Sequence, residues 1–440
     1  MKAVGAEALA AFAVLGPLMY SPLRANSRVL TAALAGTTIE FYDFYVYGTA
    51  AALVLGPLFF PKGSPDAQSL YALMSFGVAF FARPLGAILF GHFGDRVGRK
   101  STLVASLMLM GGATLAIAFL PTYAAIGWSA PALLCLLRFS QGLGLGGEWG
   151  GASLLAVENA PPGWAGRFGT VPQLGSPIGF LCANGLFLLL GLGLSDADFR
   201  SWGWRIPFLL SAVLVALGLW VRLRISETPE FKAALERNPP ASVPLTRLLA
   251  SHSGALLAAT AGAVAVFAIF YLATAFALAQ GTGPLGHTRE TFLAVQLAAS
   301  LVQAVGLLVA GWASDRYGVR ATLIFGAVAA VVIGLLFGPG LMAHSLGVVF
   351  IALAGALFIM GFVYAPLAAW MASLFPVALR YSGMSVAFSL GGIVGGAIMP
   401  IYAKLLADGG QGAYVGLLIS AAGLMTLLGV TLSRAHIETG

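Results

Sequence analysis

Charged side chains inside long apolar stretches are the first feature of this sequence that could do chemistry. A charge inside a lipid bilayer costs at least about 2.5–3.5 kcal/mol on insertion scales, so each one needs a partner or a function. Such residues are few, and all but the last lie in the first half of the chain: Glu40, Asp43, Arg83, Arg138, Glu148 and Lys404. We therefore expect charge-based chemistry to be concentrated in the first half.

Glu40 and Asp43 are three residues apart, so on a helix they share one face. Two carboxylates this close in a low dielectric cannot both be ionised cheaply, and at least one is expected to hold a proton near neutral pH. A group of this kind could take up a proton on one side of a membrane and release it on the other. The alternative is that Arg83 or Arg138 neutralises each acid permanently.

Arg83 lies in the middle of an apolar stretch and is followed by Pro84, which weakens the helical hydrogen bonds around it. A guanidinium stays charged and grips carboxylates through paired donors. We predict that Arg83 binds a substrate carboxylate; the alternative is a structural ion pair with Glu148 or with an acid of the first helix. Glu148, beside Trp149, could serve the proton route or only brace Arg83.

The second half of the chain offers mainly uncharged polar and aromatic groups within its apolar stretches: Tyr271, Gln296, Gln303, Tyr364 and Trp370. Combining the two halves, we predict a substrate site formed by Arg83, Arg138, Gln141, Glu148, Trp149, Tyr271, Gln303 and Tyr364.

These residues must be positioned by helices that cross a membrane. Of the 440 residues, 59% are hydrophobic and only 9% are charged, whereas soluble domains have about 25% charged residues. There is too little polar surface here to cover a water-soluble globule. The net charge of +7 does not indicate nucleic-acid binding, because the basic residues lie in short loops between apolar segments, as in membrane proteins.

The apolar segments are long enough for twelve crossings of about 20 residues each. We predict an all-α polytopic membrane protein with spans at 30–56, 68–91, 101–120, 129–156, 166–193, 203–223, 254–280, 290–312, 320–338, 345–374, 383–405 and 412–433. With a cytoplasmic N-terminus, most Lys and Arg residues fall on the cytoplasmic side, and only Lys62, Arg200, Arg205 and Arg289 fall outside. This asymmetry predicts that both termini are cytoplasmic.

A repeated loop divides the chain into two halves. Residues 91–100 read Gly-His-Phe-Gly-Asp-Arg-Val-Gly-Arg-Lys, and residues 311–320 read Gly-Trp-Ala-Ser-Asp-Arg-Tyr-Gly-Val-Arg. Two parallel repeats of six helices explain why this loop occurs twice. In proteins with this arrangement a transport site forms at the midplane of the membrane, between the repeats. The predicted organisation is an N-terminal extension (1–28), a first six-helix half (29–224), a cytoplasmic linker (225–253), a second half (254–434) and a tail (435–440).

The loop resembles the signature of the major facilitator superfamily. Residues 138–146 resemble the arginine-containing fourth-helix motif of the same superfamily. More specific strings, at 39–44, 146–151, 202–208 and 227–231, resemble the metabolite:H⁺ symporter family, whose members carry 2-oxoglutarate, citrate, shikimate, proline or betaine with protons. The resemblance implies the major facilitator fold, with two pseudo-symmetric halves of six helices that alternate access to a central site. It runs from about Arg28 to the end of the chain.

The resemblance also implies roles for particular residues. In related sugar:H⁺ symporters a first-helix acid pairs with the fourth-helix arginine, which implies that Asp43 and Arg138 form the proton-coupled pair, with Glu40 as the other candidate. The repeated loops would supply a cytoplasmic gate, in which Glu158 is the expected partner of Arg99; a purely topogenic role for the basic residues is the alternative. The predicted gate residues are Asp95, Arg96, Arg99, Lys100, Glu158, Asp315, Arg316 and Arg320.

Together these features predict a proton-coupled symporter that imports a small organic acid across a bacterial inner membrane and functions as a monomer. The alternatives are a proton-coupled drug or cation antiporter, a zwitterion or osmolyte symporter, and a sensor or scaffold without transport. No cofactor or metal is expected, since the sequence has no phosphate-binding loop and its two cysteines lack metal-ligand spacing. It also lacks a nucleophile elbow, so enzyme activity is not expected. The expected partners are the substrate, protons and lipid.

Overall fold

The computed structural model describes residues 22–97, 99–146, 148–224 and 244–433. The side chains of 91–103, 220–247 and 378 also lie outside the description. Within these ranges the regular structure is entirely helical. Of the helices in these described ranges, eight are long and apolar enough to cross a membrane, and two further apolar helices are shorter. The chain is a multi-pass membrane protein, because these helices carry long runs of apolar residues.

The first half contains six helical segments, several of them divided. They are, in order, α2 (Ser27–Ala50) with η1 (Ala51–Leu55) and α3 (Gly56–Phe59); α4 (Pro65–Val97); α5 (Arg99–Phe119); α7 (Ser129–Leu145) with α8 (Glu148–Glu158); α9 (Ala165–Gln173) with α10 (Gly175–Gly193); and α12 (Ile206–Arg224). Short turns of helix join them: α6 (Tyr123–Ile126), α11 (Asp196–Ser201) and η2 (Gly203–Arg205).

The second half repeats this pattern after a short helix, α14 (Pro244–Ser251). Its six segments are α15 (Ser253–Tyr271) with η3 (Leu272–Phe276) and α16 (Ala277–Thr282); α17 (Arg289–Tyr317); α18 (Val319–Leu341); α19 (Leu346–Tyr364) with α20 (Leu367–Ala372); α21 (Val377–Gly392) with η4 (Ile393–Ile398) and α22 (Met399–Asp408); and η5 (Gly412–Tyr414) with α23 (Gly416–Leu432).

The twelve segments coincide with the twelve predicted spans, which confirms the predicted fold class. The ends differ by a few residues: the second segment continues to Val97 and the eleventh begins at Val377. Hydropathy detects only the part of a helix that suits lipid, whereas backbone hydrogen bonding continues into the polar ends. The predicted linker contains the helix α14, and its residues 225–243 lie outside the description, as do the N-terminal residues 1–21.

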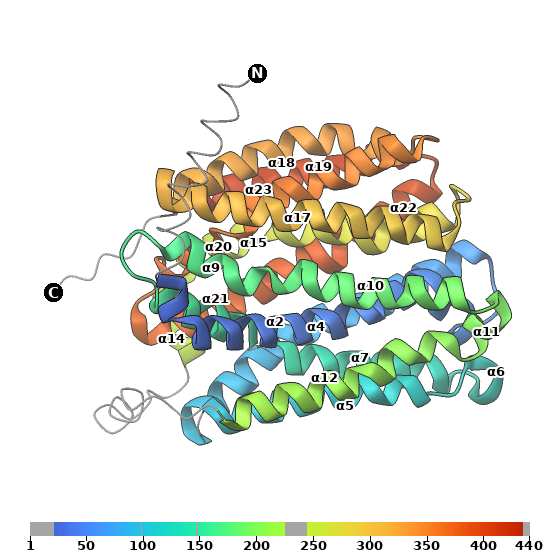
Figure 1. Ribbon diagram of the computed structural model, residues 1–440, viewed down its shortest axis with the longest axis horizontal. Helices are drawn as coiled ribbons and strands as arrows, with labels where there is room; N and C mark the ends of the chain where they lie inside the picture. Colours follow the sequence, from blue (N-terminus) through green and yellow to red (C-terminus); the bar gives the residue numbers. More distant parts are fainter. Residues whose placement is uncertain (1–21, 98, 147, 225–243, 434–440) are drawn as a thin grey trace.

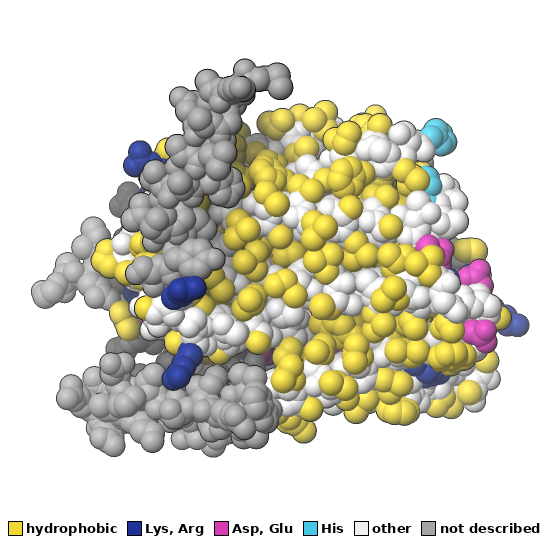
Figure 2. Space-filling view, in the orientation of Figure 1, with side chains coloured by type: hydrophobic (Ala, Val, Ile, Leu, Met, Phe, Trp, Pro, Cys, Tyr) yellow, Lys and Arg dark blue, Asp and Glu magenta, His cyan; other side chains and the backbone are white. Residues whose placement is uncertain are grey.

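The two halves lie side by side with their helices roughly along one axis (Figure 1). Across the boundary, α17 packs against α9 and α10, while α21 packs against α4 and α8. In Figure 2, apolar side chains cover the middle of the visible face and charged side chains gather toward the two ends. We call the end with the α4–α5 and α17–α18 connections the loop-motif end, and the other the opposite end.

Glycines bring the second and fourth segments into backbone contact. A Cβ atom added at Gly142 would lie 2.2 Å from the carbonyl oxygen of Ala79, and one at Gly146 would lie 2.2 Å from that of Arg83. Only glycine allows so close an approach. This crossing places the buried arginine of each helix, Arg83 and Arg138, in the same interior region.

Wide, π-helical turns interrupt the first and seventh segments at equivalent places. The segments η1 and η3 begin at Ala51 and Leu272, an offset that matches the repeat of the loop motif to within one residue. The two turns contact each other across the boundary between the halves. A π-turn shifts the helical hydrogen bonds by one residue, and such turns are common at functional sites.

Candidate functional site

Arg83 of α4 forms a buried ion pair with Glu40 of α2. Its Nη2 lies 3.2 Å from Oε1 of Glu40, and the two side chains are only 4% and 2% exposed. The guanidinium also lies within 6 Å of the ring centroids of Phe44, Phe267 and Phe388. Of the alternatives left open by the sequence, the structure shows the ion pair with a first-helix acid. Glu148 is buried as well, at the start of α8.

Asp43 is held by hydroxyl groups. Ser211 of α12 donates a hydrogen bond to its Oδ1, and Thr114 of α5 donates to its Oδ2 over 3.4 Å. Both bonds come from neutral donors within the first half, and the carboxylate is almost completely buried. The expected direct pair with Arg138 is wrong: Asp43 forms no ion pair among the described residues.

Arg138 instead reaches Asp43 through two intermediate side chains. Its Nη1 donates to Oε1 of Gln141 over 2.8 Å, and Nε2 of Gln141 donates to the Thr114 hydroxyl over 2.6 Å. Thr114 in turn contacts Asp43. Arg138 bonds Gln141 rather than Asp43 because Gln141 follows it by three residues in α7 and so lies on the same helical face, where its Oε1 accepts from the guanidinium.

The Arg138 guanidinium is fully buried in an aromatic cage. Its Cζ lies 4.1 Å from the ring centroid of Tyr47, 4.4 Å from that of Phe44 and 5.0 Å from that of Phe76. Nη2 also donates to the Phe76 carbonyl oxygen over 3.4 Å. Aromatic faces attract a cation but carry no compensating charge, and in the described part of the chain Arg138 has no carboxylate partner.

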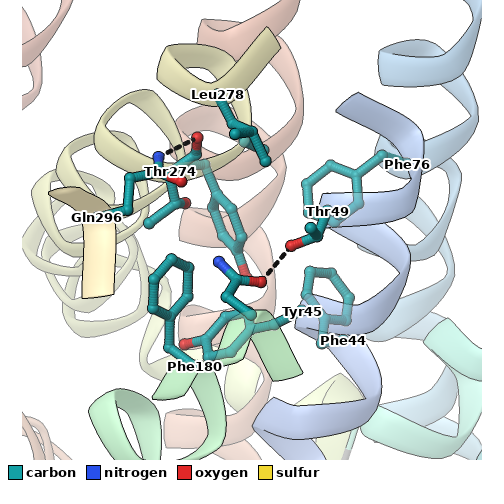
Figure 3. A pocket seen from close by; sticks show the side chains of 12 residues that line it. Phe44, Tyr45, Thr49, Phe76, Phe180, Thr274, Leu278 and Gln296 are labelled. Atoms are coloured by element: carbon teal, nitrogen blue, oxygen red, sulfur yellow. Dashed lines mark hydrogen bonds between the residues drawn. The ribbon is translucent and has the colours of Figure 1, made fainter. Parts of the chain in front are cut away.

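A small cavity lies between the two halves and is lined by residues of both. In Figure 3, Phe44, Tyr45, Thr49 and Phe76 face Thr274, Leu278 and Gln296 across it. None of the side chains that line it is charged: Phe44, Tyr45, Gly48, Thr49, Phe76, Phe180, Asn184, Tyr271, Thr274, Ala275, Leu278 and Gln296.

Of the predicted substrate residues, only Tyr271 lines this cavity. Arg83 and Arg138 lie behind its wall, because both contact Phe44. Gln303, two turns after Gln296 on α17, donates to Ser176 over 3.3 Å. Four residues of the lining were not predicted from the sequence, namely Thr49, Asn184, Phe180 and Thr274. Gln296 was predicted only as a polar group of the second half, and the signal for Asn184 was an isolated amide in an apolar span.

Trp149 and Tyr364 lie on the loop-motif side of the arginines. The Trp149 ring stacks on Phe388 of α21 at 3.6 Å between centroids and 6° between planes, and Tyr364 lies parallel to the same ring at 6.5 Å. Nε1 of Trp149 donates to Gln173 over 3.1 Å. This aromatic stack joins the two halves on that side of the cavity.

Among the described residues, two ion pairs join the halves at the loop-motif end. The Asp315 carboxylate accepts hydrogen bonds from the backbone N–H groups of Gly166 and Arg167 and from Nε of Arg167, the last over 2.6 Å. Glu158 pairs with Arg380 at 3.5 Å. The side chain of Arg99, its expected partner, lies outside the described side chains, as do those of Asp95, Arg96 and Lys100.

The second loop motif has a clear local geometry. Gly318, between α17 and α18, has a φ of 98°, which favours glycine and explains its place in the motif. Arg316 is exposed in the last turn of α17, and Arg320 donates to the Thr431 carbonyl oxygen over 2.8 Å within the second half. Of this loop's predicted gate residues, Asp315 is the one that crosses the boundary.

In the part of the chain that the structure describes, two more ion pairs join the halves at the opposite end. Nζ of Lys404 lies 3.1 Å from Asp66 of α4 and also contacts Asp408, one turn further along its own helix. Arg289 pairs with Asp196 of the first half at 3.2 Å and with the adjacent Glu290. The cavity is therefore flanked on both sides by ionic contacts between the halves.

Comparison with known proteins agrees with this architecture. The family model described as sugar (and other) transporter matches residues 28–248 and again 246–434. The inner membrane metabolite transport protein YhjE of Escherichia coli is 44% identical over 94% of this chain and 96% of its own length. The shikimate transporter of the same organism is 39% identical over 86% and 88%.

Solved structures show the same fold at lower sequence similarity. The crystal structure of a D-xylose–proton symporter superimposes with a TM-score of 0.72 at 16% identity, covering 93% of this chain and 98% of that one. The chain belongs to the sugar (and other) transporter family, and it has the fold of a proton:xylose symporter described as a major facilitator superfamily protein. It is a membrane transporter of small molecules and not an enzyme.

Proposed function

We propose that this protein is a proton-coupled symporter that imports a small organic acid across the bacterial inner membrane. The observation that carries the proposal is the environment of Arg138, a buried guanidinium without an ion-pair partner among the described residues. It lies directly behind Phe44 and Phe76 of the cavity wall. A buried charge without a countercharge is costly, and an anionic substrate in the cavity would supply one.

Asp43 is our candidate for the proton carrier. While the cavity lacks an anion, the charge of Arg138, transmitted over Gln141 and Thr114, favours an ionised Asp43. A substrate carboxylate near Arg138 would offset that charge and thereby favour protonation of Asp43. Substrate and proton then promote each other's binding, and this reciprocal coupling is what symport requires. Glu40 is the less suitable carrier, because Arg83 already neutralises it.

The distribution of Lys and Arg supports cytoplasmic termini, which puts the loop-motif end in the cytoplasm. We assign residues 29–224 and 254–434 to two bodies that rock about the cavity within a monomer, joined by the linker 225–253. Opening toward the cytoplasm would break the Arg167–Asp315 and Glu158–Arg380 pairs. Opening to the outside would break the Lys404–Asp66 and Arg289–Asp196 pairs.

The test is uptake into vesicles that contain purified protein. Labelled shikimate is the first probe, because one of the similar proteins is named as a shikimate transporter. An external pH lower than the internal pH should raise the internal concentration of substrate above the external one. A protonophore should abolish this accumulation. The Arg138→Gln variant should lose accumulation. The control is Arg205→Gln, which should retain it, because Arg205 lies at the start of the sixth segment and away from the cavity lining.

The same vesicles distinguish the alternatives. Acid-driven uptake of betaine or proline, but of no carboxylate in a broad panel, would replace the proposal with a zwitterion symporter. Proton-driven expulsion of a lipophilic cation would replace it with an antiporter. The positive charge of Arg138 behind the cavity wall disfavours the second outcome, since it would repel a bound cation.

A further inference from the structure

Ser211 of α12 makes an unusual hydrogen bond for a serine inside a helix. A helical serine or threonine commonly donates to the carbonyl oxygen four residues earlier in its own helix. Ser389 of α21 does so, to the Ser385 carbonyl oxygen over 2.7 Å. Ser211 is completely buried and instead donates to Oδ1 of Asp43 on α2. Its proton is therefore directed at the carboxylate of another helix.

Tyr42 explains why Ser211 does not bond its own helix. The carbonyl oxygen four residues before Ser211 belongs to Pro207, and it accepts a hydrogen bond from the Tyr42 hydroxyl over 2.9 Å. In an α-helix the same oxygen also accepts from the backbone N–H of the residue four positions later, here Ser211. A carbonyl oxygen has two lone pairs, so both are used and none is left for the Ser211 hydroxyl. Tyr42 and Asp43 are neighbours on α2, so the helix that fills this carbonyl also receives the released donor.

Thr114, the other hydroxyl at Asp43, has two acceptors for one proton. It donates to the carbonyl oxygen of Met110, four residues earlier on α5, over 3.0 Å, and to Oδ2 of Asp43 over 3.4 Å. A hydroxyl has a single proton, so Thr114 shares it between the two. Ser211 donates to Asp43 alone among the described residues. Ser211 is therefore the more constant donor to Asp43.

The charges around Asp43 do not act on it directly. The nearest titratable or charged groups on the surrounding helices are Tyr42 and Glu40 of α2, Arg83 of α4, Arg138 of α7 and Cys182 of α10. Glu40 and Arg83 compensate each other, and Arg138 acts through two neutral side chains. The described side chains of α5 and α12, which supply both direct hydrogen bonds, include no titratable group.

The two forms of the Asp43 carboxyl group use Ser211 differently. The ionised form accepts a hydrogen bond from the hydroxyl, and the protonated form can donate one to its oxygen. A hydrogen bond to an ionised group is about twice as strong as one between neutral groups, so Ser211 favours the ionised form. We propose that Ser211 sets the pH range over which Asp43 exchanges its proton, and that Tyr42 is the positioning residue that keeps Ser211 directed at the carboxylate. The inference rests on the proposed function only in its consequence that the same pH range governs transport.

The test follows the protonation of Asp43 without any substrate. Infrared difference spectroscopy on the purified full-length protein records the C=O stretching band of protonated carboxyl groups as the pH is changed, and the part that is absent in Asp43→Asn belongs to Asp43. In Ser211→Ala the ionised form loses its stronger hydrogen bond, so half-protonation should occur about one pH unit higher than in the wild type. Ser211→Thr retains the hydroxyl and should keep the wild-type midpoint.

Tyr42→Phe tests the positioning role while leaving both Ser211 and Asp43 in place. It frees the Pro207 carbonyl oxygen, so the Ser211 hydroxyl can turn to its own helix, and the midpoint should move in the same direction as in Ser211→Ala but by a smaller amount. The double variant Tyr42→Phe/Ser211→Ala should have the midpoint of Ser211→Ala alone, because no hydroxyl remains to be directed. Ser389→Ala removes a buried serine hydroxyl of the second half and is the control, which should keep the wild-type midpoint.

An unchanged midpoint in Ser211→Ala would overturn the proposal, and so would the absence of an Asp43 band at every pH in both proteins. A Tyr42→Phe shift that persists in full in the double variant would overturn the role of Tyr42. If Ser211→Ala does not fold, Tyr42→Phe decides, and a wild-type midpoint there would refute the arrangement.

Substrate affinity measured against pH on the same variants separates this proposal from the proposed function. If the infrared midpoint moves as expected but the affinity does not follow it, Ser211 controls Asp43, and Asp43 is not the proton carrier of transport. If the affinity depends on pH but the infrared midpoint is the same in wild type and Ser211→Ala, the proposed function stands and the role of Ser211 is wrong.

Discussion

At the residue scale, Asp43 and Glu40 are separated by three positions but have different environments. Hydroxyl donors hold Asp43, whereas a guanidinium holds Glu40. A carboxylate next to a cation resists protonation, while one held by neutral donors in a buried site accepts a proton more readily. The two acids on one helical face therefore suit different tasks.

Asp43→Asn should separate binding from accumulation. The amide mimics the protonated acid permanently, so exchange of labelled for unlabelled substrate should survive, while concentration against a gradient should vanish. Since the proposed coupling makes the protonated form bind substrate better, wild-type affinity should weaken as pH rises and Asp43 loses its proton, whereas the affinity of the variant should not change with pH. Exchange and accumulation assays in vesicles across pH 5 to 9 measure both.

Glu40→Gln is the comparison for this experiment. If it abolishes pH-dependent affinity more strongly than Asp43→Asn does, the proton carrier is Glu40 and our assignment is wrong.

The Arg83–Glu40 pair should behave as a stability element. Arg83→Gln leaves Glu40 buried without its cation, and breaking a buried pair on one side costs about 3–5 kcal/mol. The double variant Arg83→Gln/Glu40→Gln should regain most of this loss, since no charge remains unpaired. Thermal unfolding of the purified variants measures the effect. A double variant as unstable as the single one would mean that Arg83 stabilises the fold by other contacts.

At the element scale, the sequence predicts the helices far better than their interruptions. The length of each apolar segment determines where a span lies, and so twelve spans could be predicted from the order of apolar residues along the sequence. The wide turns η1 and η3 carry no comparable signal, because Ala51–Leu55 and Leu272–Phe276 consist, apart from Thr274, of ordinary apolar residues. The Gln296 amide bonds backbone carbonyl oxygens of η3, which only the folded helix makes available. For this reason Gln296 could not be assigned to the site from its residue type.

The pairing of side chains was equally hard to predict. Arg138 and Asp43 are both present as the resemblance implies, but Gln141 and Thr114 separate them. Which of several nearby partners an arginine takes depends on the rotation of each helix about its axis, and sequence spacing constrains this only within one helix.

The crossing of α4 and α7 should be sensitive to any side chain at Gly142. In Gly142→Val, the added atoms would meet the Ala79 backbone, and overpacking of this kind costs about 1–3 kcal/mol or more. The shift would also move both arginines relative to the cavity, so we expect lower thermal stability together with weaker substrate binding.

Gly112→Ala is the matched control, because a Cβ there meets nothing within 4 Å. It should unfold at or slightly above the wild-type temperature. Equal stability of Gly142→Val and wild type would show that the helices can separate without cost.

At the scale of the whole molecule, the ionic contacts at the two ends oppose each other. Asp315→Asn weakens the contact at the loop-motif end and should bias the carrier toward opening there. Lys404→Met weakens the contact at the opposite end and should bias it the other way. Accessibility of single cysteines introduced near either end, probed with membrane-impermeant reagents, should change in opposite directions. A change in the same direction for both variants would contradict alternating roles.

In the described part of the chain, Arg138 is a buried guanidinium without a carboxylate partner, and this has a consequence for the energy source of transport. In the proposed cycle its charge balances one carboxylate and one proton on Asp43 accompanies the substrate, so a cycle with a monovalent acid moves no net charge. Membrane voltage should then leave uptake unchanged, and each pH unit of gradient should support about tenfold accumulation, since one unit corresponds to about 1.36 kcal/mol per proton. Imposing a potassium diffusion potential with valinomycin at constant pH tests this, and voltage-driven uptake would require a second proton or a different stoichiometry.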